Sequence, residues 1–243
     1  MALHYSFKPA WTVSVGLIGV FSLFISLGFW QLRRAEEKQA LMATRQQRAM
    51  ESALLLDGKL PDSGDWRYRS VVVEGEYDPA HQFLLDNQIH AQKAGFHVLT
   101  PMRMRGGDEV VLVNRGWISG GPERGDYPPL AVASGPVRIA GVVDRFPGVG
   151  WKLAGAEIPG PGWPSLVQLA EPGPLGNKLG HPVLPFQVLL DPAEPDGYVR
   201  DWRETRLTPE KNRGYALQWF LFAAIALILY LRHAFSRRPS PVS

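Results

Sequence analysis

Residues 11–30 read WTVSVGLIGVFSLFISLGFW, a run of twenty residues without a single charge. As an α-helix this run spans about 30 Å, the thickness of the hydrocarbon core of a bilayer. A tryptophan at each end suits the two membrane interfaces. A cleaved signal peptide has a shorter apolar region and a small-residue cleavage site, whereas this run ends in bulky side chains and leads into Arg33 and Arg34. The sequence therefore predicts an uncleaved membrane anchor.

A second apolar run lies near the other end of the chain. Residues 215–231 read YALQWFLFAAIALILYL, with Gln218 as the only polar interruption. The helix of a soluble protein carries a polar stripe, and this run has none. Tyr215, Trp219 and Tyr230 lie near its ends, as side chains of a membrane-interface belt do. The two runs predict transmembrane helices over residues 11–32 and 214–232, with an extracytoplasmic domain over residues 33–213.

Two crossings place both termini on the same side of the membrane. The tail after the second run contains Arg232, Arg237 and Arg238, which favours a cytoplasmic tail because positive loops stay inside. Arg33 and Arg34 oppose this orientation, but the long segment between the runs is less bound by the charge rule. We therefore expect a multi-pass protein of the bacterial inner (plasma) membrane, with both termini cytoplasmic and the central domain periplasmic.

The segment between the two runs has the composition and patterning of a β-rich domain. The chain contains 25 Gly and 21 Pro among 243 residues, more than average usage. Gly106-Gly107-Asp108 predicts a hairpin turn, and residues 33–53 are expected to extend the first helix until a break at residues 60–64. Strand patterns cover residues 68–77, 82–86, 96–105, 109–118, 137–144 and 186–191. We expect a mainly antiparallel barrel- or sandwich-like domain with some helix, enclosed by two terminal transmembrane helices.

Residues 146–185 stand apart, because they contain eight prolines and eight glycines. We expect a long loop there, and two roles remain open for it: a partner-binding surface or a connecting segment.

Motifs that mark catalysis are absent from the sequence. The absence of Cys excludes thiolate metal sites, thiol catalysis and disulfides, and a net charge of +3 does not indicate nucleic-acid binding. No nucleophile elbow, zinc-protease, P-loop or dinucleotide motif is present. The six histidines have no metal-binding spacing, and Met102 and Met104 are expected to pack in the core rather than to bind copper. The sequence therefore favours a protein that is not an enzyme.

Six different short segments follow one another along the chain, from the end of the first apolar run to the start of the second. They read GFWQLRR at residues 28–34, YR at 68–69, LLDN at 84–87, GFHVLTP at 95–101, VLVNRGW at 111–117 and RGYALQWF at 213–220. Each is weak alone, but their order and their placement between two terminal helices are specific. Together they resemble the Surfeit locus protein 1 family of cytochrome oxidase assembly factors.

The resemblance implies an assembly factor for a haem–copper (cytochrome c type) terminal oxidase. Its partner would be the large catalytic subunit, on which it would act around haem insertion. Because some bacterial members are held to bind haem a, the resemblance also implies haem a as the candidate cofactor, with an axial histidine before the second helix. Asn212 stands at that position in this sequence, and an amide is a poor ligand for haem iron. His233 lies about 21 residues further on, at the opposite membrane face, and does not replace it.

The resemblance and the residue types together select ten candidates for haem or partner binding. They are Trp30, Gln31, Arg34, Arg115, Gly116, Trp117, Asn212, Tyr215, Gln218 and Trp219. Arg115 is expected to be an exposed cation at a strand end, paired with an internal carboxylate or with a partner. The candidates at the two helix ends are expected at one membrane surface, either clamping the soluble domain or forming the rim of a site between the helices.

Two interpretations from other classes compete with an assembly factor. One is a two-helix, membrane-anchored extracytoplasmic sensor or ligand-binding protein, which would need a cytoplasmic output module. The other is a membrane-anchored enzyme.

Overall fold

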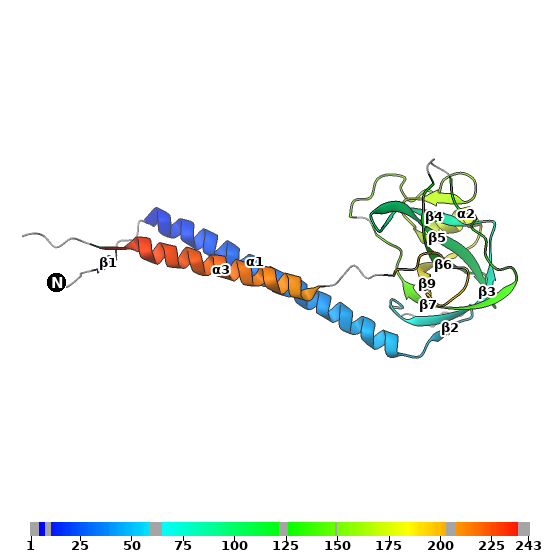
Figure 1. Cartoon of the computed structure of the whole chain (residues 1–243), viewed down its shortest axis with the longest axis horizontal. Helices are drawn as coiled ribbons and strands as arrows, with labels where there is room; N and C mark the ends of the chain where they lie inside the picture. The colour runs from blue at the N-terminus through cyan, green and yellow to red at the C-terminus, as the bar shows by residue number, and fades with distance from the viewer. Residues whose placement is uncertain are drawn as a thin grey trace, which may run out of the picture. The chain divides into compact units, whose positions relative to one another are not determined.

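The chain forms two compact units in a computed structural model that describes residues 5–7, 11–58, 65–121, 126–148, 150–202 and 208–237. The first unit contains helix α3 (Pro209–Ala234) and helix α1 (Trp11–Met50) as far as Thr44, and the second runs from Arg45 to Arg203 (Figure 1). The break predicted at residues 60–64 lies outside the described residues.

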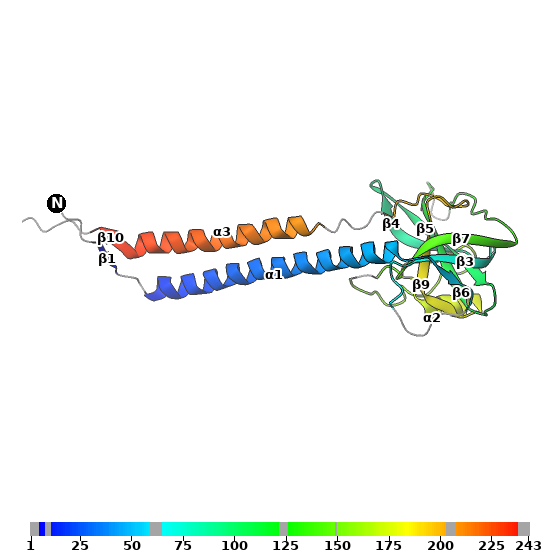
Figure 2. The same ribbon diagram turned by 90° about the horizontal axis from the view of Figure 1, so that it is seen from below.

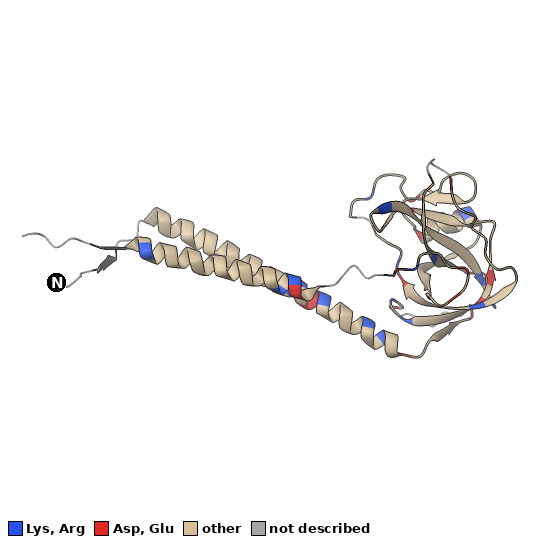
Figure 3. Cartoon of the chain, in the orientation of Figure 1, with Lys and Arg blue, Asp and Glu red and all other residues tan. Residues whose placement is uncertain are grey.

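Both helices of the first unit are long and apolar enough to cross a membrane by length and composition. Figure 3 shows no charged residue along the middle of α3 or the first half of α1. A helix over each apolar run is therefore confirmed, and so is the extension of the first helix beyond its apolar run. Two short strands at the ends of these helices, β1 (Tyr5–Phe7) and β10 (Phe235–Arg237), pair antiparallel and were not predicted.

Small residues bring the two helices together. Gly28 and Ala35 are buried on α1, and Ala216 and Ala223 are buried on α3. Each pair is seven residues apart, which places its members on the same helix face two turns apart. Small side chains allow a close approach of two helix backbones, the usual means of pairing helices in lipid. A Cβ atom on Gly28 would lie 2.5 Å from Cε1 of Phe220, so this position accepts no side chain without movement of that ring.

Aromatic rings fill the space on either side of these close contacts. Phe24 packs against Trp219 with ring centroids 5.6 Å apart, and Phe29 meets Phe220 edge-on at 5.5 Å. The Oγ of Ser14, near the start of α1, lies 2.7 Å from the hydroxyl of Tyr230, near the end of α3, whereas Gln31 further along α1 bonds to Asn212 at the start of α3. The contacts therefore run in reverse order, and the two helices are antiparallel neighbours (Figure 2).

The second unit is built on an eight-stranded sheet. Its strands, in spatial order, are β2 (Leu54–Leu56), β3 (Ser70–Tyr77), β7 (Pro136–Asp144), β9 (Val183–Leu190), β6 (Val110–Ser119), β5 (Lys93–Met104), β4 (Phe83–His90) and β8 (Ser165–Val167). All six predicted strands are present, as is the hairpin between β5 and β6.

The sheet closes on itself because β3 pairs with both β7 and β5. Along most of its length β3 lies beside β7, and at its end Gly75, Glu76 and Tyr77 pair with β5. Strands β3, β7, β9, β6 and β5 therefore form a closed ring. A Cβ atom on Gly75 would lie 2.1 Å from the carbonyl oxygen of Arg103, so a glycine is required where β3 changes partner.

The barrel-like expectation holds, but the sheet is mixed and not wholly antiparallel. The pairs β2–β3, β4–β8 and β6–β9 are parallel. Parallel neighbours need a long crossover connection, and the chain between β6 and β9 supplies one that contains β7 and β8.

Two of the three hydrophobic clusters among the described residues of the domain lie on opposite sides of β6. One lies inside the ring and includes Met102 and Met104, which confirms that this pair packs in the core. The other includes Phe83, Leu99 and Leu175. Strand β6 faces both clusters, and nine of its ten residues are consequently buried.

The expected long loop over residues 146–185 is wrong in part. This segment contains β8 and a helix, α2 (Pro172–Leu179), which packs beside β9. Pro172 occupies the first turn of the helix, and Gly180 ends it in a left-handed conformation with φ 74°. Proline and glycine at these two positions are helix boundary signals, which composition alone does not distinguish from loop residues.

The close approach at Gly28 makes a direct prediction about the helix pair. Replacing Gly28→Ile places a branched side chain against Phe220, and we expect a loss of about 1–3 kcal/mol of folding stability from overpacking. Gly19→Ile, on the same helix with nothing within 4 Å of the new Cβ, is the matched control. Thermal unfolding of the full chain in detergent micelles measures both. Equal midpoints for the two variants would contradict the close packing.

Candidate functional site

The segment Asn114-Arg115-Gly116-Trp117 lies on β6 and connects several parts of the second unit. Asn114 is fully buried, and its Oδ1 accepts a hydrogen bond from the Gly116 amide at 3.1 Å. Its Nδ2 donates to Oε1 of Gln187 at 3.0 Å, and Gln187 in turn donates from Nε2 to the carbonyl oxygen of Arg145. Because each bond has a fixed donor, the orientation of both amide groups is determined.

This chain of amides sets the protonation of His97. Nδ2 of Asn114 lies 3.2 Å from Nδ1 of His97, and because Nδ2 is a donor, Nδ1 must be the acceptor. The neutral imidazole therefore has its proton on Nε2. Burial, together with the nearby His90, lowers the pKa of His97 from 6.5 to about 4. His97 is thus a neutral hydrogen-bond donor at physiological pH.

Tryptophans surround this histidine. The Trp202 ring meets His97 nearly perpendicular, with centroids 5.8 Å apart, and donates from Nε1 to the carbonyl oxygen of Leu190. Trp117, the register partner of His97 on β6, donates from Nε1 to the carbonyl oxygen of Gln88. Both rings are therefore held in place by main-chain acceptors.

Gly116 allows the end of β6 to approach a neighbouring segment. It has φ 112°, and a Cβ there would lie 2.7 Å from the carbonyl oxygen of Val199. Trp117 donates its amide to Val199, and Tyr198 donates its amide to the carbonyl oxygen of Arg115. A side chain at Gly116 would push this segment away.

Arg115 corrects the expectation of an exposed cation, because it is 1% exposed. Its Nε donates to the carbonyl oxygen of Asp196 at 2.7 Å, and Nη2 donates to that of Ala131 at 2.6 Å. Nη1 lies within reach of Oε1 of Gln82, Oγ1 of Thr100 and the carbonyl oxygen of Leu130. Within the described ranges, no carboxylate forms an ion pair with this guanidinium.

The electrostatics of Arg115 follow from this environment. Burial lowers the pKa of the guanidinium, which still remains a cation. Five neutral oxygen acceptors and the Tyr198 ring, 5.0 Å from Cζ, offset the cost of desolvation. The side chain therefore ties the strand to two loops, and it is not available to a partner.

The candidates on the helices form a polar cluster of their own. Nζ of Lys38 donates to Oδ1 of Asn212 at 2.7 Å, and Nδ2 of Asn212 donates to Oε1 of Gln31 at 2.7 Å. The next residue on α3, Arg213, donates to Oε1 of Gln39, the next residue on α1, at 2.6 Å. These bonds lie immediately beyond the apolar runs, so they link α1 to α3 at one end of the pair.

The remaining helix candidates do not join this cluster. Trp30 is 47% and Tyr215 44% exposed, and Gln218 is exposed as well. Arg34 makes an exposed ion pair with Glu37 on its own helix, and Trp219 packs against Phe24. The structure thus joins only Gln31 and Asn212 among the seven. Arg115, Gly116 and Trp117 belong to the other unit.

Several residues of these networks were not among the candidates. Lys38 follows the GFWQLRR segment, and Asn114 begins NRGW. Both residues could therefore have been selected from these two motifs. Gln187 and Trp202 occur in no motif, and only the fold brings Gln187 to Asn114 and Trp202 to His97.

The residue at the implied haem position does not fit haem iron. The amide oxygen of Asn212 already accepts from Lys38 and its nitrogen already donates to Gln31. An amide also lacks the strongly donating lone pair of an imidazole. His233, near the far end of α3, is about 32 Å away along the helix axis.

The buried guanidinium of Arg115 predicts a large loss of stability on its removal. Arg115→Met keeps an unbranched chain but leaves the carbonyl oxygens of Leu130, Ala131 and Asp196 without this donor. We expect a loss of about 3 kcal/mol in the free energy of unfolding. Arg138→Met, at a side chain that is 70% exposed, is expected to change it by less than about 0.5 kcal/mol. Urea unfolding of the full chain in detergent, followed by tryptophan fluorescence, compares them, and equal midpoints would refute the internal role.

The depressed pKa of His97 predicts a pH-dependent stability. Below pH 6.5 the unfolded chain binds a proton at this imidazole, whereas the folded chain does so only near pH 4. The free energy of unfolding should therefore fall as the pH is lowered from about 6.5 towards about 4. His97→Gln should reduce this slope, and Trp151→Phe, at an exposed side chain that does not titrate, should leave it unchanged. Urea midpoints at a series of pH values measure the slope, and equal slopes in all three proteins would disprove the assignment.

Comparison with known proteins matches the SURF1 family over residues 18–224. The SURF1-like protein of Rickettsia felis is 35% identical over 101 residues, which are 41% of this chain and 43% of that relative. The SURF1-like protein of Monosiga brevicollis is 24% identical over 235 residues, 88% of this chain and 85% of the relative. The cytochrome oxidase assembly protein SHY1 of Saccharomyces cerevisiae is 30% identical over 95 residues, 38% of this chain and 24% of SHY1.

The aligned part spans less than half the length of the Rickettsia relatives. The family match, by contrast, runs from within α1 to within α3 and includes the whole β-rich unit. The chain is therefore a member of the SURF1 family.

Proposed function

We propose that this chain is a non-enzymatic assembly factor for a haem–copper oxidase of the cytochrome c type, acting on the large catalytic subunit around haem insertion. The observation that carries the proposal is the family match over residues 18–224, together with a relative named as a cytochrome oxidase assembly protein. The match covers parts of both apolar helices and the whole β-rich unit, so the helix surface and the domain surface would both contact the partner.

In this proposal α1 and α3 cross the inner membrane, the termini are cytoplasmic and the β-rich domain is periplasmic. The length and composition of the helices support a crossing. Their small-residue contacts and the basic side chains after α3 support the pairing and the orientation.

The helix pair would hold the partner through its lipid-facing side. Leu217, Leu221 and Phe222 are 60%, 51% and 47% exposed on α3. In a bilayer such side chains contact lipid or the helices of another membrane protein. The polar cluster around Asn212 would fix the geometry of the pair while the partner is bound.

Handling of haem a, in this proposal, belongs to the partner subunit. The engaged amide of Asn212 supports a role in holding the subunit that receives haem, rather than ligation by this residue. The absence of Cys from the sequence supports haem or subunit handling over thiolate-based copper delivery.

Deletion of the gene in the source organism tests the proposal. Assembled oxidase and its haem a absorbance should fall, while the transcript of the large subunit stays unchanged, because assembly and not expression is lost. Complementation with the full chain should restore both. The b-type haem of an unrelated respiratory complex is the internal control. Unchanged oxidase spectra in the deletion strain would reject the function.

A further inference from the structure

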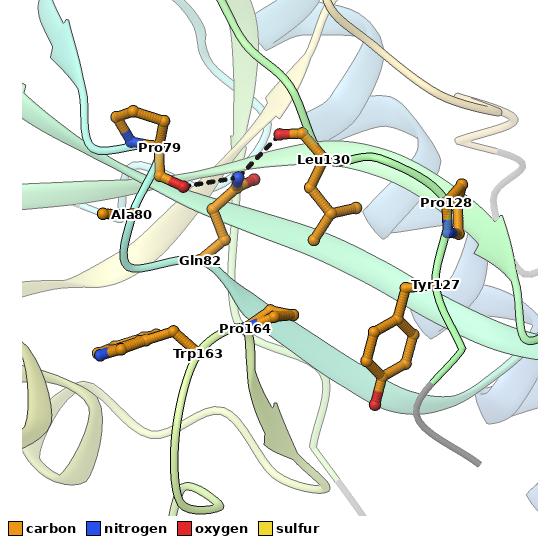
Figure 4. Close-up of a pocket in the computed structure, with 8 residues that line it drawn as sticks. All are labelled: Pro79, Ala80, Gln82, Tyr127, Pro128, Leu130, Trp163 and Pro164. Atoms are coloured by element: carbon orange, nitrogen blue, oxygen red, sulfur yellow. Dashed lines mark hydrogen bonds between the residues drawn. The ribbon is translucent and has the colours of Figure 1, made fainter.

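A pocket of about 320 Å³ opens on the surface of the β-rich unit. Pro79, Tyr127, Pro128, Trp163 and Pro164 form most of its lining, and none of the described lining residues is charged. Figure 4 shows Trp163 and Tyr127 on opposite sides of Pro164.

The two aromatic rings of the pocket are fixed before any ligand arrives. Trp163 meets the rings of His81 and Phe83 edge-on, with centroids 4.8 Å and 5.1 Å away, and Nζ of Lys178 lies 4.9 Å from the Trp163 centroid. Tyr127 packs perpendicular to Phe96 at 5.4 Å. A preformed apolar surface of this kind loses little conformational freedom on binding.

The carbonyl oxygens around the pocket are already occupied from the inside. Nε2 of Gln82 donates to the carbonyl oxygens of Pro79 and Leu130 at 3.1 Å and 2.8 Å (Figure 4). The Tyr198 hydroxyl donates to the carbonyl oxygen of Pro129 at 3.2 Å. Oε1 of Gln82 accepts from Thr100, so its side chain has no spare group for a ligand.

Two side-chain polar groups of the lining remain: the Tyr127 hydroxyl, which can donate or accept, and the Trp163 indole N–H, which only donates. Neither the Tyr127 hydroxyl nor Nε1 of Trp163 makes a hydrogen bond to any other described residue. The pocket therefore presents an uncharged surface of rings and prolines with a hydroxyl and an indole N–H available to donate. With two donors and one acceptor, its complement is an uncharged, apolar ligand with more acceptors than donors.

We propose that this pocket binds an extended proline-rich segment of a partner protein. Proline has no N–H, and a polyproline II segment has outward carbonyl oxygens with no internal hydrogen bonds. Such segments dock on aromatic-lined surfaces because their rings pack on aromatic side chains and their carbonyls accept from indole and hydroxyl groups. The inference goes beyond the oxidase role and does not depend on it.

Calorimetric titration of the detergent-solubilised full chain with a synthetic all-proline peptide tests the proposal. Saturable binding is expected for this peptide and none for a Gly-Ser peptide of equal length. Tyr127→Phe and Trp163→Phe keep an aromatic ring but remove a donor, and each should weaken binding about two- to tenfold, the equivalent of one hydrogen bond. Trp151→Phe, at an exposed tryptophan outside the pocket, is the matched control and should bind as the wild type does.

Three outcomes would overturn the proposal. The first is no saturable binding to the wild type. The second is equal affinity in Tyr127→Phe, Trp163→Phe and Trp151→Phe, which would place the peptide elsewhere. The third is a dimer of the wild type that Tyr127→Phe dissociates, which would make a second copy the occupant. Circular dichroism checks that each variant folds. If Trp163→Phe does not fold, the affinity of Tyr127→Phe alone tests the proposal.

Discussion

The buried guanidinium of Arg115 holds several segments of the β-rich unit in place through hydrogen bonds to their oxygen atoms. Arg115 projects from β6, and its acceptors come from the loop at residues 130–131, from Asp196 and from the buried side chains of Gln82 and Thr100. Since a buried cation without an ion pair depends on these acceptors, the segments that supply them have to stay in place. The same loop contributes Leu130 to the wall of the proline-lined pocket. The adjacent Asn114 uses an equally fixed set of bonds to keep His97 neutral.

The helix unit is held together differently. Small residues allow the backbones of α1 and α3 to come close, and hydrogen bonds between polar side chains join the two helices at one end. Gly28 and Ala223 allow the backbones to come close, and the bonds of Asn212 to Gln31 and Lys38 end the apolar interface. A polar group near a lipid boundary is satisfied most readily by another protein group. This explains why a position suspected of holding haem iron is instead fully engaged between helices.

Much of this architecture could be predicted from the sequence, and the remainder depended on distant partners. Both helices and six strands follow from hydropathy and period-two patterns, which are local properties. The inward direction of Arg115 could not be predicted, because its acceptors lie 15 to 81 residues away in the chain. The helix α2 was missed because its boundary residues, Pro172 and Gly180, resemble those of a loop. Among the helix candidates, the link between Gln31 and Asn212 required knowledge of the antiparallel pairing, whereas the exposed Trp30 and Tyr215 agree with an interface belt.

The proposed function, in which the chain holds a large oxidase subunit during its assembly, rests on membership of the SURF1 family and on the paired apolar helices. Affinity purification of the tagged full chain from solubilised membranes of its source organism tests that account most directly. The account predicts that the large oxidase subunit is enriched over an untagged control, while the large subunit of another respiratory complex is not. Recovery of the oxidase subunit at the level of the untagged control would contradict it.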